Sequence, residues 1–496
     1  MTLVNAPTPG MQTGRHGWRG GLLACLVSMA LGGCATMHAR APGQAVLPAA
    51  KISLPADLQL ARDAWPVAQW WHRFADPQLD GLIDRALAQA PSLAVARARI
   101  EAAQAQARLV DANTGPLVGF SADLDRESVS ANGFLGPYGK TVPLLGTTGP
   151  WYTEGTLGVS GQLDVDLWGK DRARVNAALG VAQARVAEEA LAELLLSARI
   201  VDAYEDSLAQ AQSLELLHQA RDIEHEATNG HVARSTRGLE PRSLTELAHE
   251  RELALDQQIL AARGRQRQLR EVLRALLGAS GDEDIRIEPR PLPADFDDLP
   301  ATLGYELLAR RPDLQARRWM LQASLDEIDA AKAAFYPSFD IRAFAGFDAL
   351  HLDDLFQHSS RQFNLVPGLS LPIFDSGRLN ANLATARARN EALIADYNQA
   401  ILDAVRDVAQ GCIALDSLEH QATVQQGRVA AEQFASDSAQ AHYRRGLSDR
   451  ITALESELPV LNEQQQALAI QSAQVHAQVA LIVALGGGYD ASRSAR

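Results

Sequence analysis

Two stretches of the chain decide its fold, because each is a version of the other. Residues 90–124 read APSLAVARARIEAAQAQARLVDANTGPLVGFSADL, and residues 311–347 read RPDLQARRWMLQASLDEIDAAKAAFYPSFDIRAFAGF. Pro116 matches Pro337 at an offset of 221 residues. In each stretch a helical pattern gives way to alternating apolar and polar residues. An internal repeat at this spacing predicts two copies of one structural unit.

The repeat continues towards the C-terminal ends of both halves. LDVDLWGKDR (163–172) matches LSLPIFDSGR (369–378) at an offset of 206 residues. The drop from 221 to 206 leaves about fifteen extra residues in the first half, where residues 128–155 are rich in Gly, Pro, Ser and Thr. The excess is therefore predicted to be a longer loop.

Each half is predicted to contain a helix, a strand, a loop, a second strand, a very long helix, a turn and a long helix. We expect the first repeat over residues 76–278 and the second over 303–486. A Pro- and acid-rich linker over 279–302 joins them, and a short tail follows over 487–496.

Four segments alternate with period two, which predicts strands with one apolar face. Their bounds are about 117–127, 156–168, 338–348 and 362–374. Their length suits tilted strands that cross a bilayer, although a half-buried soluble hairpin would show the same pattern. Four strands cannot close a barrel, and an open edge in lipid leaves backbone groups unpaired. If the strands span a membrane, several chains must therefore share one barrel.

Acidic residues occupy some of the polar strand positions, which predicts an acidic interior that favours cations. These residues are Asp123, Asp164, Asp166 and Asp340.

The predicted helices are unusually long and cover residues 170–229, 241–278, 377–443 and 448–485. About sixty residues at roughly 1.5 Å each give a helix near 90 Å, far longer than a globular helix. Apolar residues in these segments recur at steps of 3 and 4, as in coiled coils. The chain is thus predicted to be mainly α-helical, with its β-strands in a membrane.

The N-terminus has the pattern of a secretory signal peptide over residues 1–33. A basic region with Arg15 and Arg19 precedes a short apolar stretch that ends in Leu31-Gly32-Gly33-Cys34. This ending resembles a bacterial lipobox, which implies cleavage before Cys34, lipid on that residue and a lipidated linker over 34–75. The alternative is an ordinary signal peptide with a chance cysteine. Ala35 after the cysteine points to the outer membrane, as in such lipoproteins.

Composition argues against nucleic-acid binding and against catalysis. A formal net charge of −14 and a pI near 5.4 leave no patch to neutralise phosphates. His225-Glu226 begins like a zinc-protease helix, but Asn229 stands where the second histidine ligand is needed. We therefore predict no catalytic residue, no metal site and no cofactor.

Several phrases together resemble the outer membrane factor family of tripartite efflux pumps, the TolC-like channels, and specifically their lipoprotein (NodT/OprM-like) branch. They spread over nearly the whole mature chain and read WWHRFADPQLDGLIDRAL (70–87), LDVDLWGK (163–170), ARRPDLQARR (309–318), AAKAAFYPSFDI (330–341), LSLPIFDSGRLNA (369–381) and ALGGGY (484–489).

The resemblance implies a homotrimer with a 12-stranded outer-membrane β-barrel, continuous with a periplasmic α-helical barrel. It implies a passive channel that takes drugs or other small toxic compounds from an inner-membrane pump and a periplasmic adaptor to the exterior. The cargo itself is not legible in the sequence. The alternative is a periplasmic coiled-coil adaptor or structural lipoprotein without a pore.

The resemblance also places an adaptor contact and a gate at the turns between the long helices. The two turns contain Gly238-Leu239 and Gly446-Leu447, where glycine allows a tight reversal. The family's paired aspartates fall on Thr452 and Glu455, so only one acid is retained. The hypothesis is that five tip residues form gate contacts between neighbouring helices, the alternative being solvated charges: Tyr443, Arg444, Arg445, Asp449 and Glu455. Together with the turn glycines Gly238 and Gly446 they make up the predicted periplasmic gate or adaptor-contact site.

Overall fold

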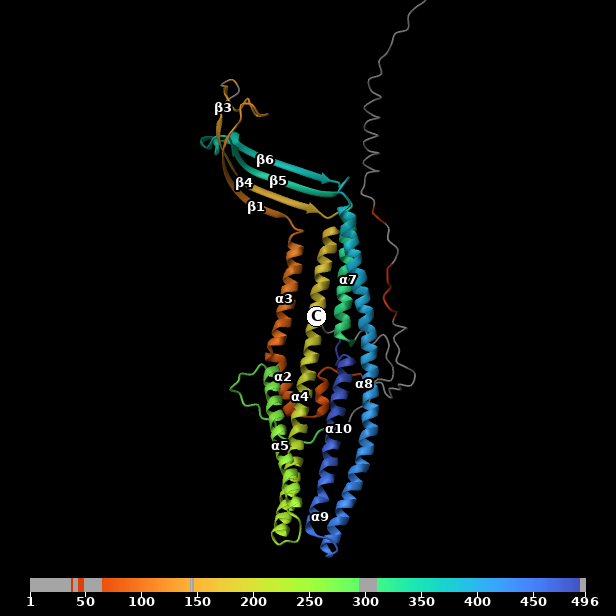
Figure 1. Cartoon of the computed structure of the whole chain (residues 1–496). Coiled ribbons are helices and arrows are strands. Elements are labelled where there is room, and N and C mark those ends of the chain that lie inside the picture. Colours follow the sequence, from red (N-terminus) through yellow and green to blue (C-terminus); the bar gives the residue numbers. More distant parts are fainter. Residues whose placement is uncertain are drawn as a thin grey trace, which may run out of the picture. The chain divides into compact units, whose positions relative to one another are not determined.

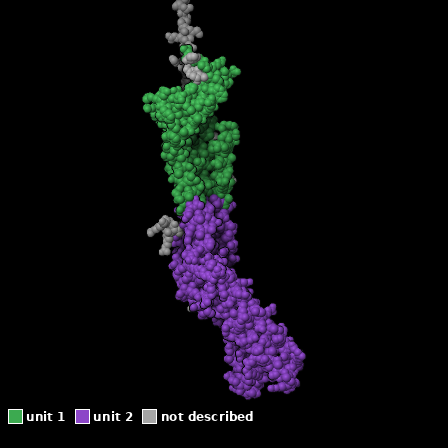
Figure 2. All heavy atoms as spheres, turned by 90° about the vertical axis from the view of Figure 1, so that its left-hand side faces the viewer, with its two compact units in different colours: residues 1–43, 104–181, 321–392 green, residues 44–103, 182–320, 393–496 purple. Residues whose placement is uncertain are grey.

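The structure is a computed structural model of the chain. It describes residues 37–38, 43–48, 65–142, 144, 147–293 and 310–490. The predicted signal peptide and the lipid site at Cys34 lie outside the described residues, as do parts of both linkers and most of the C-terminal tail. The described chain divides into two compact units (Figure 2). One contains residues 104–181 and 321–392 with the described part of 1–43, and the other contains 44–103, 182–320 and 393–496.

The first half of the chain contributes η2 (Trp70–Phe74), α2 (Pro77–Gln89), α3 (Pro91–Ala112), β1 (Leu117–Ser128), β2 (Thr141–Val142), β3 (Thr147–Thr148), β4 (Trp151–Val165), α4 (Lys170–Thr236) and α5 (Arg242–Leu277) (Figure 1). The second half contributes α7 (Pro312–Ala333), β5 (Ser338–Ala349), η4 (Leu352–Asp354), η5 (His358–Ser360), β6 (Arg361–Ser370), α8 (Arg378–Arg444), α9 (Arg450–Glu455) and α10 (Glu457–Ala484). Both halves thus contain a helix, two long strands, a helix of 67 residues and a return segment.

The four long strands form one antiparallel sheet in the order β1-β4-β5-β6. The register pairs Phe120 with Val159, Val159 with Ala345, and Ala345 with Phe363. Directly paired residues lie on the same face of a sheet, so the register collects the apolar rows of all four strands on one face. Strands β1 and β6 are the two edges, and each has one side without a strand partner within the described chain.

Two strands end earlier than their predicted bounds of 168 and 374. Strand β4 ends at Val165 because the next residues form the start of α4: the Arg172 N–H donates to Asp166 Oδ2 at 3.0 Å, and Gly169 turns the chain at φ +76°. Strand β6 ends at Ser370, just before Pro372, which has no N–H to continue the ladder.

Strand β4 begins earlier than predicted, at Trp151 instead of 156, because β1 extends to Ser128 and pairs with it there. Helix α4 runs to Thr236, beyond the predicted end at 229, because the single Gly230 does not end it. The helix predicted over 448–485 is divided at Ser456 into α9 and α10. The apolar stripe continues through this break, so periodicity alone did not reveal it.

Four long helices of the second unit form a layer in the order α5, α4, α10, α8 (Figure 1). Arg251 of α5 donates to Glu224 of α4 at 2.9 Å, and Gln425 of α8 donates to Glu463 of α10 at 2.7 Å. Between them, His476 of α10 bridges two carboxylates of α4. Helices α5 and α8 are therefore the edges of this layer.

The segment Arg450–Ala484 is long and apolar enough, by length and composition, to cross a membrane. Val475, Val479 and Ile482 are nevertheless buried in the main hydrophobic core, together with residues of α2, α4 and α5. The segment is thus a core helix of the helical layer, interrupted at Ser456.

The WWHRFADP stretch supplies much of that core. Trp70, Trp71 and Phe74 are buried, and their rings meet edge to face. The Tyr204 hydroxyl donates to Asp76 Oδ2 at 2.5 Å, and Arg290 lies 2.8 Å from the same oxygen. This polar group joins α2, α4 and the segment after α5 inside an otherwise apolar core.

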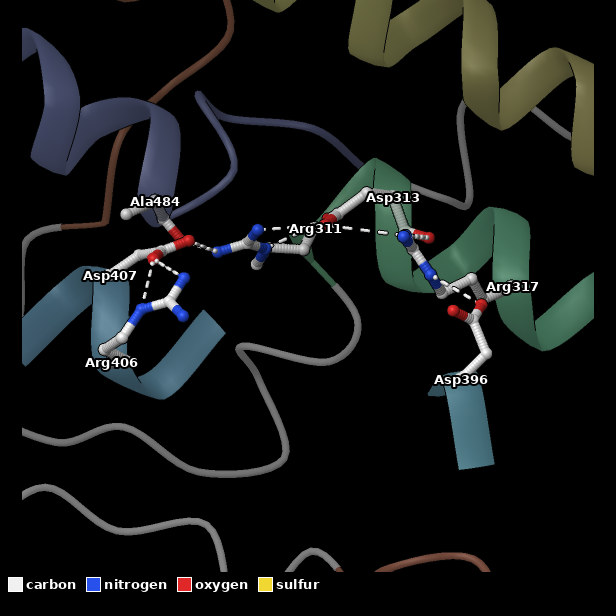
Figure 3. Close-up of polar contacts among 7 residues, drawn as sticks. All are labelled: Arg311, Asp313, Arg317, Asp396, Arg406, Asp407 and Ala484. Atoms are coloured by element: carbon white, nitrogen blue, oxygen red, sulfur yellow. Dashed lines mark hydrogen bonds and ion pairs between the residues drawn. The ribbon is translucent and has the colours of Figure 1, made fainter. Parts of the chain in front are cut away.

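Arg311 joins the start of α7 to the end of α10 (Figure 3). Its Nε and Nη2 donate to the two carboxylate oxygens of Asp313, both at 2.9 Å, and its Nη1 donates to Ala484 O at 3.1 Å. Gly486 follows at φ +91°, where a Cβ would lie 1.9 Å from Arg310 O, so only glycine fits. The ARRPDL and ALGGGY phrases are therefore two sides of one contact.

Glu205 provides a stability test of the core. Its side chain is 2% exposed, its Oε2 has no hydrogen-bond partner within the described chain, and burial raises its pKa to about 7. The unfolded chain releases this proton near pH 4.5, so the group costs stability as pH rises from there to about 7. We expect Glu205→Gln to raise the free energy of unfolding by on the order of 3 kcal/mol at pH 8 and hardly at pH 4.5.

The measurement is the unfolding midpoint in detergent at both pH values. Exposed Glu250→Gln is the matched control. A gain of equal size at pH 4.5 and pH 8 would contradict the prediction.

Candidate functional site

The sheet has two chemically different faces. The apolar face is open to the surroundings in a single chain: Val118, Phe120, Phe363 and Leu365 are 70–76% exposed. The other face is mainly polar and carries the acidic residues predicted for the interior, except that Asp166 lies beyond β4 and caps α4. Such a sheet suits two different solvents, one apolar and one aqueous.

Aromatic residues lie at both ends of the strands. At the end next to the helices, the Trp168 ring stacks on Tyr336 with centroids 5.0 Å apart, and its Nε1 donates to Pro337 O at 2.7 Å. At the other end, the Arg126 guanidinium lies over the Trp151 ring, 5.7 Å from its centroid. Tryptophan and tyrosine favour the boundary between lipid and water, so these pairs delimit the apolar band.

The helix-side end of the polar face is also charged. Asp164 and Asp340 are directly paired across β4 and β5, and Arg342 Nε donates to Asp340 Oδ2 at 2.9 Å. These residues line a cavity of about 560 Å³. On the polar side of the sheet one guanidinium therefore binds one of two carboxylates that are paired across the strands.

The two predicted turns have the same backbone geometry. Gly238 has φ +70° and Gly446 has φ +72°, the left-handed region that favours glycine. The Leu239 N–H donates to Arg234 O, and the Leu447 N–H donates to His442 O, both at 2.9 Å. Leu239 and Leu447 are 71% and 72% exposed, so each hairpin presents an apolar side chain at its tip.

Three of the predicted gate residues project from the end of α8 into solvent. Tyr443, Arg444 and Arg445 are exposed, and within the described chain their side chains make no ion pair or side-chain hydrogen bond. They are therefore available to a neighbouring molecule.

The other two predicted gate residues contact the first hairpin. Asp449 accepts a bond from the Thr452 N–H at 3.0 Å, which lowers the pKa of its carboxyl, and it lies 3.6 Å from Arg234 of α4. Glu455 Oε1 accepts from Arg251 Nη2 of α5 at 2.6 Å and lies 3.6 Å from His231 Nε2 of α4. These contacts connect α9 to both helices of the first hairpin.

Sequence reasoning missed the partners of Asp449 and Glu455. Arg251 also binds Glu224, a carboxylate that is 1% exposed, and Arg450 forms an ion pair with Glu226. Arg251 is 204 residues from Glu455 in the chain, so no local motif could pair them. The only signal was the density of charge near both turns.

His476 fastens α10 to α4 further along the layer. Its Nδ1 lies 2.9 Å from Asp202 Oδ1 and its Nε2 lies 2.8 Å from Asp206 Oδ1. The hydrogen bonds to Asp202 and Asp206 raise its pKa to about 10, so the imidazole is a cation at neutral pH. Within the described residues no group of three or more His, Cys, Asp or Glu could hold a metal ion.

The described N-terminal residues lie along α8. The His38 N–H donates to Asn380 Oδ1 at 3.1 Å, and Arg387 Nη1 donates to His38 O at 2.8 Å. In the second unit, the Leu47 N–H donates to Asn398 Oδ1 at 2.8 Å. Side chains of α8 thus hold the backbone of this segment.

Comparison with known proteins places this arrangement in a family. A model of the family described as "Outer membrane efflux protein" matches residues 82–279 and 303–487. The multidrug resistance outer membrane protein MdtP of Shigella flexneri is 46% identical over 475 residues, which are 95% of this chain and 97% of that protein. The multidrug resistance outer membrane protein MdtQ of Escherichia coli O157:H7 is 39% identical over 480 residues, 94% of this chain and 98% of that protein.

Solved structures show the same fold. The outer membrane protein VceC from Vibrio cholerae is similar with a TM-score of 0.76 and 30% identity, over 86% of this chain and 100% of VceC. The Campylobacter jejuni CmeC outer membrane channel has a TM-score of 0.80 at 20% identity, over 92% of this chain and 95% of CmeC. The two repeats, the four-stranded sheet with its apolar face and the paired helical hairpins thus belong to a known class of protein, and the chain is a member of the outer membrane efflux protein family.

Proposed function

We propose that three copies of this chain form the outer-membrane channel of a tripartite efflux pump. The channel passively conducts drugs or other small toxic compounds from a periplasmic pump assembly to the exterior. One observation carries the proposal: the register puts the apolar rows of all four strands on one exposed face, while both edges of the sheet lack a strand partner among the described residues. Such a sheet is stable in lipid only if its edges are paired by other copies.

The helical layer also supports assembly of several copies into a ring. Its edge helices carry exposed apolar side chains: Leu247, Leu253 and Leu260 on α5, and Val424 and Phe434 on α8. The two edges differ, so contact between them is head to tail, and head-to-tail contacts form a ring when the rotation from copy to copy closes. Three copies would bring twelve strands into the barrel, and the number three comes from the family resemblance.

The first prediction about the channel concerns the assembled particle. We expect the purified full chain to have the mass of three chains in detergent and to give discrete channel openings in a planar bilayer. A monomeric, water-soluble and electrically silent protein would contradict the proposal and favour the alternative, an adaptor or structural lipoprotein without a pore.

The N-terminal segment supports a lipid anchor on Cys34. His38 is bonded to Asn380 in the first turn of α8, and α8 follows β6, a strand assigned to the membrane. His38 follows Cys34 by four residues, and four residues span at most about 14 Å, so a lipid anchor on Cys34 would lie near the proposed barrel.

The second prediction tests this anchor. Intact-mass spectrometry of membrane-extracted protein should show a chain that starts at Cys34 and carries the added mass of acyl chains. The Cys34→Ala variant should lack that mass. A mature chain that begins elsewhere, or an unmodified Cys34, would contradict the proposal.

We further propose that Tyr443, Arg444 and Arg445 close the periplasmic mouth by contacts with the neighbouring copy. Their side chains are exposed and lack partners within the described chain, while Asp449 and Glu455 hold α9 to the first hairpin. A ring of three copies would bring these side chains close together at the tip.

The third prediction follows from this gate. The Tyr443→Ala/Arg445→Ala variant should raise the single-channel conductance or the open fraction, because it removes contacts between copies. Arg242→Ala is the control, since Arg242 is a highly exposed cation at the other turn. Unchanged conductance in a correctly assembled trimer would refute the gate.

The adaptor and the inner-membrane pump are the proposed partners. Both turns present the same Arg-Gly-Leu sequence and the same geometry, with Leu239 and Leu447 projecting. Each chain has two equivalent turns. An adaptor with repeated hairpin tips could therefore make the same apolar contact at each turn. The names of the relatives suggest drugs as cargo, and outer-membrane lipid surrounds the barrel.

A further inference from the structure

We propose that the break between α9 and α10 is a hinge, about which α9 swings when the tip opens. The inference deepens the proposed gate and rests on it. It names the moving part as α9, Arg450–Glu455, and the pivot as Ser456-Glu457-Leu458-Pro459.

The sequence at the pivot prevents a continuous helix. Pro459 has no N–H, so the carbonyl of Glu455 loses its helical donor, and the proline ring crowds the same carbonyl. Pro459 is the third residue of α10, and proline is tolerated in a first turn because those N–H groups have no helical acceptor. The same four residues therefore end one helix and begin the next.

Side chains replace the missing backbone bonds at the pivot. Ala453 O accepts from Ser456 Oγ at 2.6 Å and from Gln440 Nε2 of α8 at 3.1 Å. Gln440 Nε2 also lies 2.5 Å from Glu457 Oε1 on the other side of the break. Side-chain bonds of this kind need no fixed helical register, so they permit a change of angle that a continuous helix would resist.

The two sides of the pivot are held in different ways. On the tip side, α9 is fastened by partly exposed ion pairs to Arg234 and Arg251, each worth little in water. On the other side, Gln425 donates to Glu463 in a buried contact, and Val475 and Val479 are in the core. Helix α9 also buries two residues, Ile451 and Ala453, whereas α10 buries nine, so α9 is the side that moves.

One packing contact defines the closed position of α9. Ile451 is buried against Gly230 of α4, where a Cβ would lie 2.9 Å from the isoleucine side chain. The glycine leaves a notch for the isoleucine. Release of α9 therefore means withdrawing Ile451 from this notch and separating Glu455 from Arg251.

The experiment uses the full-length, lipidated protein. It combines a substitution that removes an attachment of α9 with one that makes the pivot more rigid. Glu455→Gln removes the ion pairs to Arg251 and His231 with little change of shape. Pro459→Ala restores a backbone donor and should fuse α9 with α10. Pro241→Ala is the matched control, because Pro241 precedes α5 at the other turn.

We expect Glu455→Gln to raise the open fraction in a planar bilayer about threefold, as for the loss of an exposed ion pair. In the Pro459→Ala background the same substitution should give less than half of that gain, while Pro241→Ala should leave the gain unchanged. Equal gains in both proline backgrounds would overturn the hinge.

Hydrogen exchange gives a readout that does not need a working pore. Glu455→Gln should speed amide exchange over residues 449–456 but leave 460–484 protected. With Pro459→Ala the increase should be suppressed or spread into α10. If exchange over 449–456 rises equally with and without Pro459, the hinge is wrong; if the particle is silent in bilayers yet shows the expected exchange pattern, the channel proposal fails and the hinge stands.

Discussion

The free-energy cost of an unpaired backbone N–H or C=O group in lipid is the constraint that determines how this structure is built. The four-stranded sheet of the described chain has two open edges, and inside a membrane the outward-facing N–H and C=O groups of these edges lack partners. The same incompleteness recurs in the helical layer, where α5 and α8 end the row with exposed leucine, valine and phenylalanine side chains. A single copy therefore forms only part of a closed structure, and both its sheet and its helical layer need neighbouring copies.

The internal repeat explains how one sequence builds both parts. Each half sends a strand into the sheet, returns with a second strand, and continues directly into a helix of 67 residues. In each half, the second strand of the sheet therefore leads directly into a long helix of the helical layer. Contacts such as that of Arg311 with Asp313 and Ala484 join segments from opposite ends of the second repeat. Two of the phrases that carry the family resemblance, ARRPDLQARR and ALGGGY, meet in this contact although they lie far apart in the chain.

Much of the architecture could be predicted from the sequence because it depends on the periodicity of apolar residues. Alternation predicted the four strands and the common apolar face, and the absence of proline predicted the long helices. The break at Ser456 was missed because the apolar stripe of the last helix continues through Pro459, although the proline itself was visible. The partners of Asp449 and Glu455 could not be read at all, since Arg234 and Arg251 lie more than 200 residues away and meet them only after both hairpins fold. The lipid site at Cys34 and the closure at Tyr443 remain predictions.

The unlike edges of the helical layer have a genetic consequence. A mutant chain that keeps its strands but is damaged at α8 still offers an intact α5 edge to a normal copy. It would enter mixed assemblies and spoil them, so such an allele should behave as dominant when both versions are expressed together. A mutant chain damaged at both edges would instead be excluded from the assembly and behave as recessive. The dominance pattern of alleles thus reports whether a mutation damages one edge or both.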